Sequence, residues 1–301
     1  MSNYSKISFD ASNTNSSWYK ILQLIPPKSS VLDIGCSSGN FGAELTARRD
    51  CIVDGIEVEP GDAKVAQKKL RKVYLLDIEK DDLGLIKEKY DVIYFGDVIE
   101  HLVKPTETLS RIKPLLKYKG MVLFSIPNMA HISVRLALLR GNFNYAETGL
   151  LDKTHLHFYD QNEVERVFSE AGYEITNLQF VEKDYPREFL SKELKKIGLN
   201  PTEKFYDIAA KPGASAYQFV GSAKPSKTKR HRLAEIGPID MFNSFYENTK
   251  LGYEQQIKEL IKELDKTQQR AQSAQQLLKY KVEHPYRAVA GHFKRKVKSK
   301  P

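Results

Sequence analysis

Cysteines and long apolar runs are both scarce in this sequence. Its 301 residues include two cysteines, Cys36 and Cys51, too few for a disulfide framework. No apolar run approaches the roughly 20 residues of a membrane-spanning helix, and the first four residues (MSNY) are polar where a secretory signal would be basic and then apolar. These absences argue against a disulfide-stapled secreted domain and an integral membrane protein, so we expect a cytoplasmic protein.

Net charge is also small over most of the chain. The formal net charge is +9, from 47 Lys and Arg against 38 Asp and Glu. Residues 222–301 hold 18 of the basic and 8 of the acidic residues, which leaves 29 basic and 30 acidic residues before them. The globular part therefore lacks the basic surface of a nucleic-acid groove, and nucleic acid is not expected as a partner.

A glycine turn in residues 31–42 (VLDIGCSSGNFG) stands between a buried strand and the start of a helix. Such a turn directs unpaired backbone N–H groups at a ligand, and Gly35 and Gly39 let the chain bend sharply. The dinucleotide fingerprint G-x-G-x-x-G fails, because serine and asparagine stand at its second and third glycine positions. Asp33, two residues before Gly35, would repel a pyrophosphate and suits a ligand with an ammonium group. A turn without any ligand is the alternative.

Alternating strands and helices follow this turn. The order predicts a doubly wound, mostly parallel α/β sheet with its ligands at the carboxyl ends of the strands. Strands are expected at residues 31–34, 51–58, 73–78, 90–95, 121–126, 173–181 and 216–223. Helices are expected at residues 12–25, 41–49, 63–72, 131–139 and 163–171, with a helical pair inserted within 188–210.

The pattern D-x-G-x-x-x-G at Asp33, Gly35 and Gly39 resembles the first motif of class I S-adenosylmethionine-dependent methyltransferases. The resemblance covers residues 12–223 and implies their Rossmann-like fold, in which a late pair of strands, the last antiparallel, completes a seven-stranded sheet. In that family the carboxylate of the motif holds the methionine amino end of the cofactor, and the glycines face it.

The resemblance places further acids at the cofactor. Glu57, 22 positions after Gly35, would accept the ribose hydroxyls, unless it is a solvated acid at a strand end. Asp77 would meet the adenine amino group, although it could equally cap a helix. The expected cofactor set is Asp33, Gly35, Cys36, Gly39, Glu57, Asp77, Ile78, Gly96 and Asp97.

Asp97, Glu100 and His101 form a second constellation, D-x-x-E-H, after the expected fourth strand. If Asp97 opens a helix, Glu100 and His101 share its face. Two carboxylates and an imidazole at a strand end can hold a divalent cation or place a base. Capping and packing of a helix start is the alternative.

Residues 148–159 (TGLLDKTHLHFY) form a third constellation. His155 and His157 share a face of an extended chain, opposite Leu156 and Phe158. If that apolar pair packs on the core, both histidines border the cleft. We favour His155 as the base because Asp152 and Thr154 are near enough to orient it, against a purely structural hydrogen bond.

The second and third constellations together resemble the ubiquinone-biosynthesis and small-RNA 2′-O-methyltransferases, where similar residues bind a magnesium-like ion. Here Asp97, Glu100, His101 and His155 would be the ligands, and His155, His101 and Asp97 the catalytic residues. Residues 125–128 and 154–156 resemble more closely a bacterial group associated with glycosyltransferases and surface-polysaccharide synthesis. We therefore expect O-methylation of a sugar hydroxyl in a glycan or its precursor. The alternatives are a small phenolic or quinone-like acceptor and a non-catalytic scaffold.

The chain beyond residue 223 reads as three segments: a basic linker (224–245), a helical segment (246–283) and a basic amphipathic tail (284–301). Ile257, Leu260, Leu264, Ala271, Ala274 and Leu278 follow a three–four spacing, with Thr267 at the remaining position. This spacing predicts a weak coiled coil that joins copies or partner chains, with a lone solvated helix as the alternative. The tail could dock on an anionic membrane at its inner face, or on a glycosyltransferase.

Overall fold

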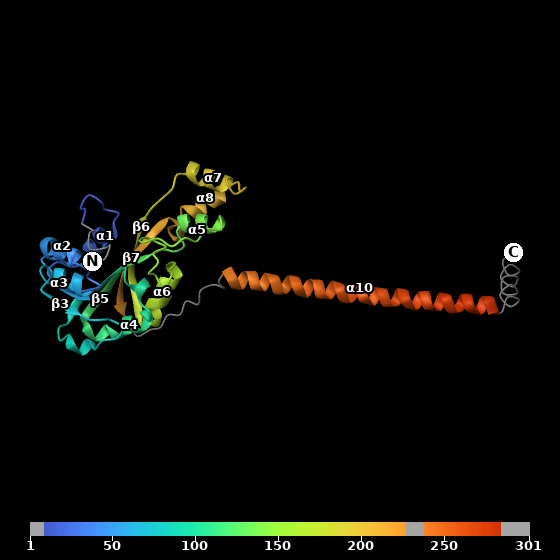
Figure 1. The fold of residues 1–301 in the computed structure, drawn as a ribbon, viewed down its shortest axis with the longest axis horizontal. Coiled ribbons are helices and arrows are strands. Elements are labelled where there is room, and N and C mark those ends of the chain that lie inside the picture. The colour runs from blue at the N-terminus through green and yellow to red at the C-terminus, as the bar shows by residue number, and fades with distance from the viewer. Residues whose placement is uncertain (1–8, 227–237, 284–301) are drawn as a thin grey trace. The chain divides into compact units, whose positions relative to one another are not determined.

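The computed structural model describes residues 9–226 and 238–283. The chain forms two compact units, residues 1–232 and residues 233–301, and each is considered by itself (Figure 1). The predicted amphipathic tail (284–301) and half of the predicted linker, residues 227–237, lie outside the described residues.

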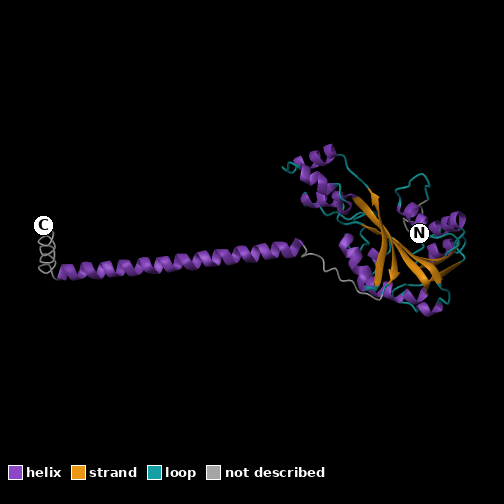
Figure 2. Ribbon diagram, turned by 180° about the vertical axis from the view of Figure 1, so that it is seen from behind, coloured by secondary structure: helices purple, strands orange, loops and turns teal. Residues whose placement is uncertain are grey.

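The first unit is built on one seven-stranded sheet (Figure 2). Its spatial order is β3-β2-β1-β4-β5-β7-β6. Strands β1 to β5 pair in parallel, whereas β7 is antiparallel to both of its neighbours. The predicted fold class and the antiparallel last strand are thereby confirmed. The strands are β1 (Ser30–Ile34), β2 (Ile52–Glu57), β3 (Lys72–Leu75), β4 (Tyr90–Gly96), β5 (Leu116–Pro127), β6 (Tyr173–Glu182) and β7 (Ala216–Pro225).

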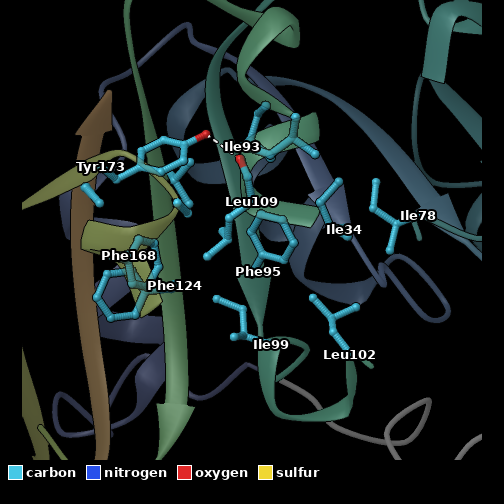
Figure 3. Packing of buried hydrophobic residues seen from close by; sticks show 14 of the residues in the cluster. Ile34, Ile78, Ile93, Phe95, Ile99, Leu102, Leu109, Phe124, Phe168 and Tyr173 are labelled. Carbon is cyan, nitrogen blue, oxygen red and sulfur yellow. Dashed lines mark hydrogen bonds between the residues drawn. The ribbon is translucent and has the colours of Figure 1, made fainter. Parts of the chain in front are cut away.

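Helices cover both faces of this sheet. Successive residues of a strand point to opposite faces, so Val31 packs in one core with helices α1 to α3, and Leu32 packs in the other with α4 and α6. Figure 3 shows the second core, where the Tyr173 hydroxyl donates to the Leu109 carbonyl at 2.9 Å. These helices are α1 (Ser17–Leu24), α2 (Asn40–Arg49), α3 (Pro60–Ala66), α4 (Pro105–Arg111) and α6 (Gln161–Glu170).

Helix α3 ends earlier than predicted, at Ala66 instead of residue 72. The backbone N–H of Arg71 donates to the Val53 carbonyl, and its guanidinium pairs with the buried Asp54 of β2. These tertiary contacts draw residues 67–71 away from the helix axis and lead the chain into β3.

A small helical cap stands beside the sheet. It has its own core, which includes Ile132, Leu136, Leu190 and Leu194. Its helices are α5 (Ile132–Leu139), α7 (Arg187–Lys195), α8 (Glu203–Ala209) and the short α9 (Pro212–Ser215). The predicted helical pair within residues 188–210 is therefore present as α7 and α8.

The second unit contains the long helix α10 (Pro238–Glu283). It begins before the predicted start of the helical segment at residue 246. Among the described residues, no helix is both long enough and apolar enough to cross a membrane.

Candidate active site

The glycine turn joins β1 to α2. Gly35 and Gly39 both have left-handed backbone conformations, with φ of 66° and 73°. A Cβ on Gly35 would lie 2.8 Å from Val98 Cγ2, and one on Gly39 would lie 3.1 Å from the Ala66 Cα. Both positions therefore require glycine, and the turn presents bare backbone at the carboxyl edge of the sheet.

Asp33 is buried at the end of β1, with 4% of its surface exposed. Burial, and to a smaller extent the nearby Glu57, raises the pKa of Asp33 to about 8. A cation bound next to Asp33 would reverse this effect, because opposite charge favours the ionised carboxylate. Contact between Asp33 and a positively charged ligand group stays a prediction, with which this burial is compatible.

Glu57 ends β2 and locks the turn in place. Its Oε2 accepts from the Ser37 N–H at 2.7 Å, and its Oε1 accepts from the Val58 and Glu59 N–H groups, each at 2.9 Å. A carboxylate offers about four lone-pair positions, so roughly one remains for a ribose hydroxyl. The solvated strand-end acid does not describe this buried side chain.

The remaining predicted cofactor residues have mainly structural contacts. The Cys36 thiol packs on β2, where a Cβ on Gly55 would lie 2.4 Å from its sulfur. Asp77 accepts from the Glu79 N–H at 2.9 Å and pairs with Lys80 at 2.6 Å, and these two bonds lower its pKa. Ile78 belongs to the core (Figure 3), and a Cβ on Gly96 would lie 2.5 Å from the Tyr94 hydroxyl.

Asp97 does not open a helix. It has a φ of 53°, and only a short 3-10 turn, Ile99–His101, follows it. Its Oδ1 accepts from the Ser125 hydroxyl at 2.9 Å, and Gln218 Nε2 donates to both carboxylate oxygens at 3.1 Å. Asp97 is thus fixed by two residues of neighbouring strands, whereas burial raises its pKa.

Ser125 and Gln218 are site residues that the sequence reasoning missed. Ser125 stands opposite Gly96 in the β4–β5 register, so the strand alignment itself was a usable signal. Gln218 arrives on antiparallel β7, opposite Pro127. No motif surrounds Gln218, and only the fold brings it to Asp97.

Glu100, His101 and His155 converge at the centre of the site. One ligand atom from each lies within 4.8 Å of the others. His155 Nε2 lies 3.9 Å from Glu100 Oε1, and the two histidine rings meet edge to face at 4.8 Å between centroids. Asp97, the fourth predicted metal ligand, is not part of this group.

Both histidines of this Glu100–His101–His155 cluster are oriented by backbone carbonyls. His101 Nδ1 lies 3.1 Å from the Thr154 carbonyl oxygen, and His155 Nδ1 lies 3.3 Å from that of Leu150. A carbonyl only accepts, so each Nδ1 carries the proton and each Nε2 keeps a free lone pair.

Of the two residues expected to orient His155, Asp152 accepts from the His155 backbone N–H through its carbonyl at 3.1 Å. The Asp152 carboxylate accepts from the Thr154 N–H and hydroxyl at 2.8 and 2.7 Å. Thr154 in turn contacts His101. The turn at Asp152 thus directs Thr154 toward His101, and orientation of the His155 ring by Asp152 stays a prediction.

The predicted orientation of residues 156–158 was wrong. Leu156 and Phe158 are 56% and 38% exposed, while His155 is buried. His157 Nε2 approaches the Val103 carbonyl at 3.4 Å, away from the cluster. The N–H groups of Leu156 and His157 both donate to the Glu100 carbonyl, which turns His155 inward and its neighbours outward.

The buried surroundings of the Glu100 carboxyl disfavour a negative charge. Within the described part of the chain, neither Glu100 oxygen has a hydrogen-bond partner. Burial and the nearby Asp97 hold the pKa of Glu100 well above its ordinary value, while burial and His101 lower the pKa of His155. Burial therefore favours the neutral form of both groups, and a cation beside Glu100 would favour its ionised form.

A cavity of about 370 Å³ opens over this cluster. Its lining includes Asp97, Glu100 and His155, together with Trp18 and residues of the segment before it. Trp18 also packs on Phe41, with 5.1 Å between ring centroids. Trp18 therefore both packs against the core and borders the cavity.

The sequence of this chain is similar to those of known proteins. A family model described as a methyltransferase domain matches residues 13–178, more than half of the chain. The chain is 28% identical over 122 residues to a ubiquinone biosynthesis O-methyltransferase from Actinobacillus pleuropneumoniae, covering 38% of this chain and 52% of the relative. It is 31% identical over 122 residues to a malonyl-[acyl-carrier protein] O-methyltransferase from Halalkalibacterium halodurans, covering 36% and 45%. The chain spans about half the length of these curated relatives.

The fold has solved counterparts as well. A SAM-dependent methyltransferase from Archaeoglobus fulgidus superposes with a TM-score of 0.50 at 18% sequence identity, over 71% of this chain and 94% of that one. This likeness concerns the fold alone. The chain belongs to the methyltransferase domain family.

Proposed function

We propose that the protein transfers a methyl group from S-adenosylmethionine to a hydroxyl oxygen, and that the acceptor is a sugar of a glycan or glycan precursor. The observation that carries the oxygen assignment is the buried, unpartnered Glu100 beside the free Nε2 of His155, at 3.9 Å in the described structure. A hydroxyl must lose its proton as it attacks, whereas an amine does not. His155, a base beside the buried Glu100, can take that proton.

The cofactor supplies a methyl group on a positively charged sulfur. Asp33 would bind its ammonium group, and the charge of the ligand would bring the Asp33 pKa down from about 8. Glu57 would accept a ribose hydroxyl, while Gly35 and Gly39 let the ligand reach the backbone. To contact adenine, the Asp77 carboxylate would have to accept from the adenine amino group as well as from Lys80.

His155 is the proposed base. Its Nδ1 proton is held by Leu150, so Nε2 is the atom that takes the proton of the acceptor hydroxyl. The lowered pKa keeps the ring neutral and ready at neutral pH. Glu100 then stabilises the charged ring, because its carboxylate lies next to the protonated Nε2.

A divalent cation at the Glu100–His101–His155 cluster is the alternative to His155 as the base, because both roles would use the same Nε2 lone pair. Two imidazoles with carbonyl-bound Nδ1 atoms and one unpartnered carboxylate are the donor set and support typical of a metal site. A cation there would lower the pKa of an acceptor hydroxyl. Asp97 would act from outside this set, since Ser125 and Gln218 already hold it.

The sugar assignment rests on the chemistry of the cavity. Its lining combines hydroxyl and amide groups with aromatic rings, among them Asn13, Ser16, Ser17, Tyr217 and Trp18. Hydroxyls and amides bind sugar hydroxyls, and an aromatic face packs on sugar C–H groups. The resemblance of residues 125–128 and 154–156 to the polysaccharide-associated group points to the same acceptor.

A small phenolic or quinone-like acceptor is the second candidate. It is favoured by the names of the ubiquinone-biosynthesis relatives, which cover 38% of this chain in the comparison above. A non-catalytic scaffold fits less well, because the turn, Asp33 and the cluster are all in place.

Labelled methyl transfer separates these candidates. The protein is incubated with S-adenosylmethionine carrying an isotopically labelled methyl group, together with either lysate glycans or a catechol. Mass spectrometry then locates the label, with His155→Ala as the control. Label on a sugar oxygen is expected. Label on catechol alone would favour the second candidate, and label on nitrogen would refute the oxygen assignment.

Cation binding has its own readout. Cobalt(II) or manganese(II) is titrated into chelator-treated protein by calorimetry, and Glu100→Gln is compared with wild type. We expect one site in the wild type and loss of at least about tenfold in affinity in the variant. Equal binding by the two proteins would exclude the cluster as the cation site.

A further inference from the structure

The long helix α10 carries an apolar stripe that is exposed along its described length. Every side chain described between residues 250 and 283 is exposed. Ile257, Leu260, Leu264 and Leu278 are 55%, 64%, 58% and 68% exposed. Ala271, Ala274 and Thr267 complete the stripe at three–four spacing. Such a stripe is stabilised when a second helix covers it.

We propose that the occupant is α10 of a second copy of this chain, packed antiparallel. The register places Leu264 of one copy opposite Thr267 of the second. The same register places Ile257 opposite Ala274 and Leu260 opposite Ala271. Two-fold symmetry repeats each contact, so the interface is self-complementary.

Side-chain size selects the antiparallel orientation. Large residues occupy the first half of the stripe and small residues most of the second half. In a parallel pair, Ala271 and Ala274 would each face their own copies, while Leu260 and Leu264 would face theirs. The helices would then need different separations along their length, although interaxial distance is set by the side chains in contact. The antiparallel register instead places a small residue against each large one from Ile257 to Leu264, as dense packing requires.

Charge selects the same orientation. Glu263 and Arg270 each come directly before a residue of the stripe. Charged residues at such flanking positions form ion pairs between the helices and set their orientation. They face each other across the antiparallel pair, twice by symmetry. In a parallel pair Glu263 would face Gln268, and Arg270 would face Gln275.

The wider charge pattern agrees with this pairing. Residues 254–265 contain two lysines and four carboxylates, whereas residues 266–280 contain three basic residues and no acid. An antiparallel pair sets the acidic half of each helix against the basic half of the other. A parallel pair would set like against like.

The orientation also fixes where the two chains enter the coiled coil. At 1.5 Å per residue, the two Pro238 ends would lie roughly 80 Å apart in the antiparallel pair. In a parallel pair they would lie side by side. Each copy of the methyltransferase unit would therefore be tethered at its own end.

Disulfide trapping tests the orientation in the full-length protein. Both native cysteines are buried, so they do not compete with introduced ones. Ile257→Cys and Ala274→Cys are made separately, oxidised alone or as an equimolar mixture, and run on a non-reducing gel. We expect a band at twice 34.4 kDa from the mixture and not from either variant alone. Cross-linking of each variant with itself would overturn the proposal.

Charge reversal gives an independent test by sedimentation equilibrium. Glu263→Arg and Arg270→Glu should each weaken dimerisation by at least about fivefold, because two attractive pairs become repulsive, and the double variant should recover it. The matched control, Lys262→Glu, changes a charge on the outer face and should leave the dimer intact. A monomer at all concentrations, or a dimer indifferent to the two single reversals, would overturn the proposal.

Discussion

Replacing Asp33 by asparagine should stabilise the cofactor-free protein at neutral pH while removing its ligand affinity. Asparagine has nearly the shape of protonated aspartic acid but cannot ionise. In the folded chain the Asp33 carboxyl has a pKa of about 8, against 3.8 for an ordinary aspartate, because it is buried and lies near Glu57. The folded state therefore holds a proton that the unfolded state releases.

The sign and size of the effect follow from this difference. A carboxyl with a raised folded pKa contributes full stability below the unfolded pKa, and this stability is lost as the pH rises toward 8. The loss is about 1.4 kcal/mol per pH unit, which amounts to about 4 kcal/mol at pH 7 for Asp33. Asp33→Asn avoids this loss.

Urea denaturation of the cofactor-free protein between pH 5 and pH 8.5 measures the effect. The difference in unfolding free energy between Asp33→Asn and wild type should increase by about 3 kcal/mol from pH 5 to pH 7. This difference should level off above pH 8. The matched control is Asp54→Asn, on the adjacent strand. Asp54 accepts from Tyr90 at 2.7 Å and pairs with Arg71, so its loss should destabilise by about 1–3 kcal/mol. A pH-independent difference between Asp33→Asn and wild type would refute the reasoning.

Three further predictions concern single side chains. His155→Ala should lower kcat by about 10²- to 10⁴-fold with unchanged cofactor affinity, and wild-type activity should rise with pH to a midpoint below 6.5, because the pKa of His155 is lowered; a midpoint above 6.5 would contradict this role. Gly55→Ala should cost about 1–3 kcal/mol in thermal unfolding, because its Cβ would lie 2.4 Å from Cys36 Sγ, and Cys36→Ala should restore the loss; no restoration would mean that Cys36 does not limit the space. Gln218→Met should raise the pKa of Asp97 further, since a hydrogen bond that lowers it is removed; carbon-13 NMR of the carboxyl would show an unchanged pKa if the contact is unimportant.

The central sheet was predictable because its strands are apolar runs. The bounds expected for the strand beginning at Tyr90 differ from β4 by one residue. Strand β5 was harder: it begins at Leu116, five residues before the expected start, and its residues Lys117 to Lys119 are exposed and polar. Polar residues in a strand leave no alternation for a sequence pattern to detect.

The positions of the proposed cofactor residues could be predicted from the sequence, whereas the contacts of the Glu100–His101–His155 cluster could not. Asp33 and Glu57 stand at the carboxyl ends of neighbouring parallel strands, so topology alone places them together. The contact between Glu100 and His155 joins segments 55 positions apart in the sequence, and the role of Thr154 depends on how one turn bends. Such contacts depend on tertiary packing, which local patterns do not encode.

Calorimetric titration of S-adenosylmethionine at pH 7 tests the proposed site most directly. With a pKa near 8, Asp33 is about nine-tenths protonated at pH 7, and pairing with the ligand ammonium should expel that proton. We therefore expect one binding site whose heat changes with the ionisation enthalpy of the buffer, and a loss of both affinity and buffer dependence in Asp33→Asn. Absence of binding, or equal binding by wild type and Asp33→Asn, would contradict a cofactor pocket at the glycine turn.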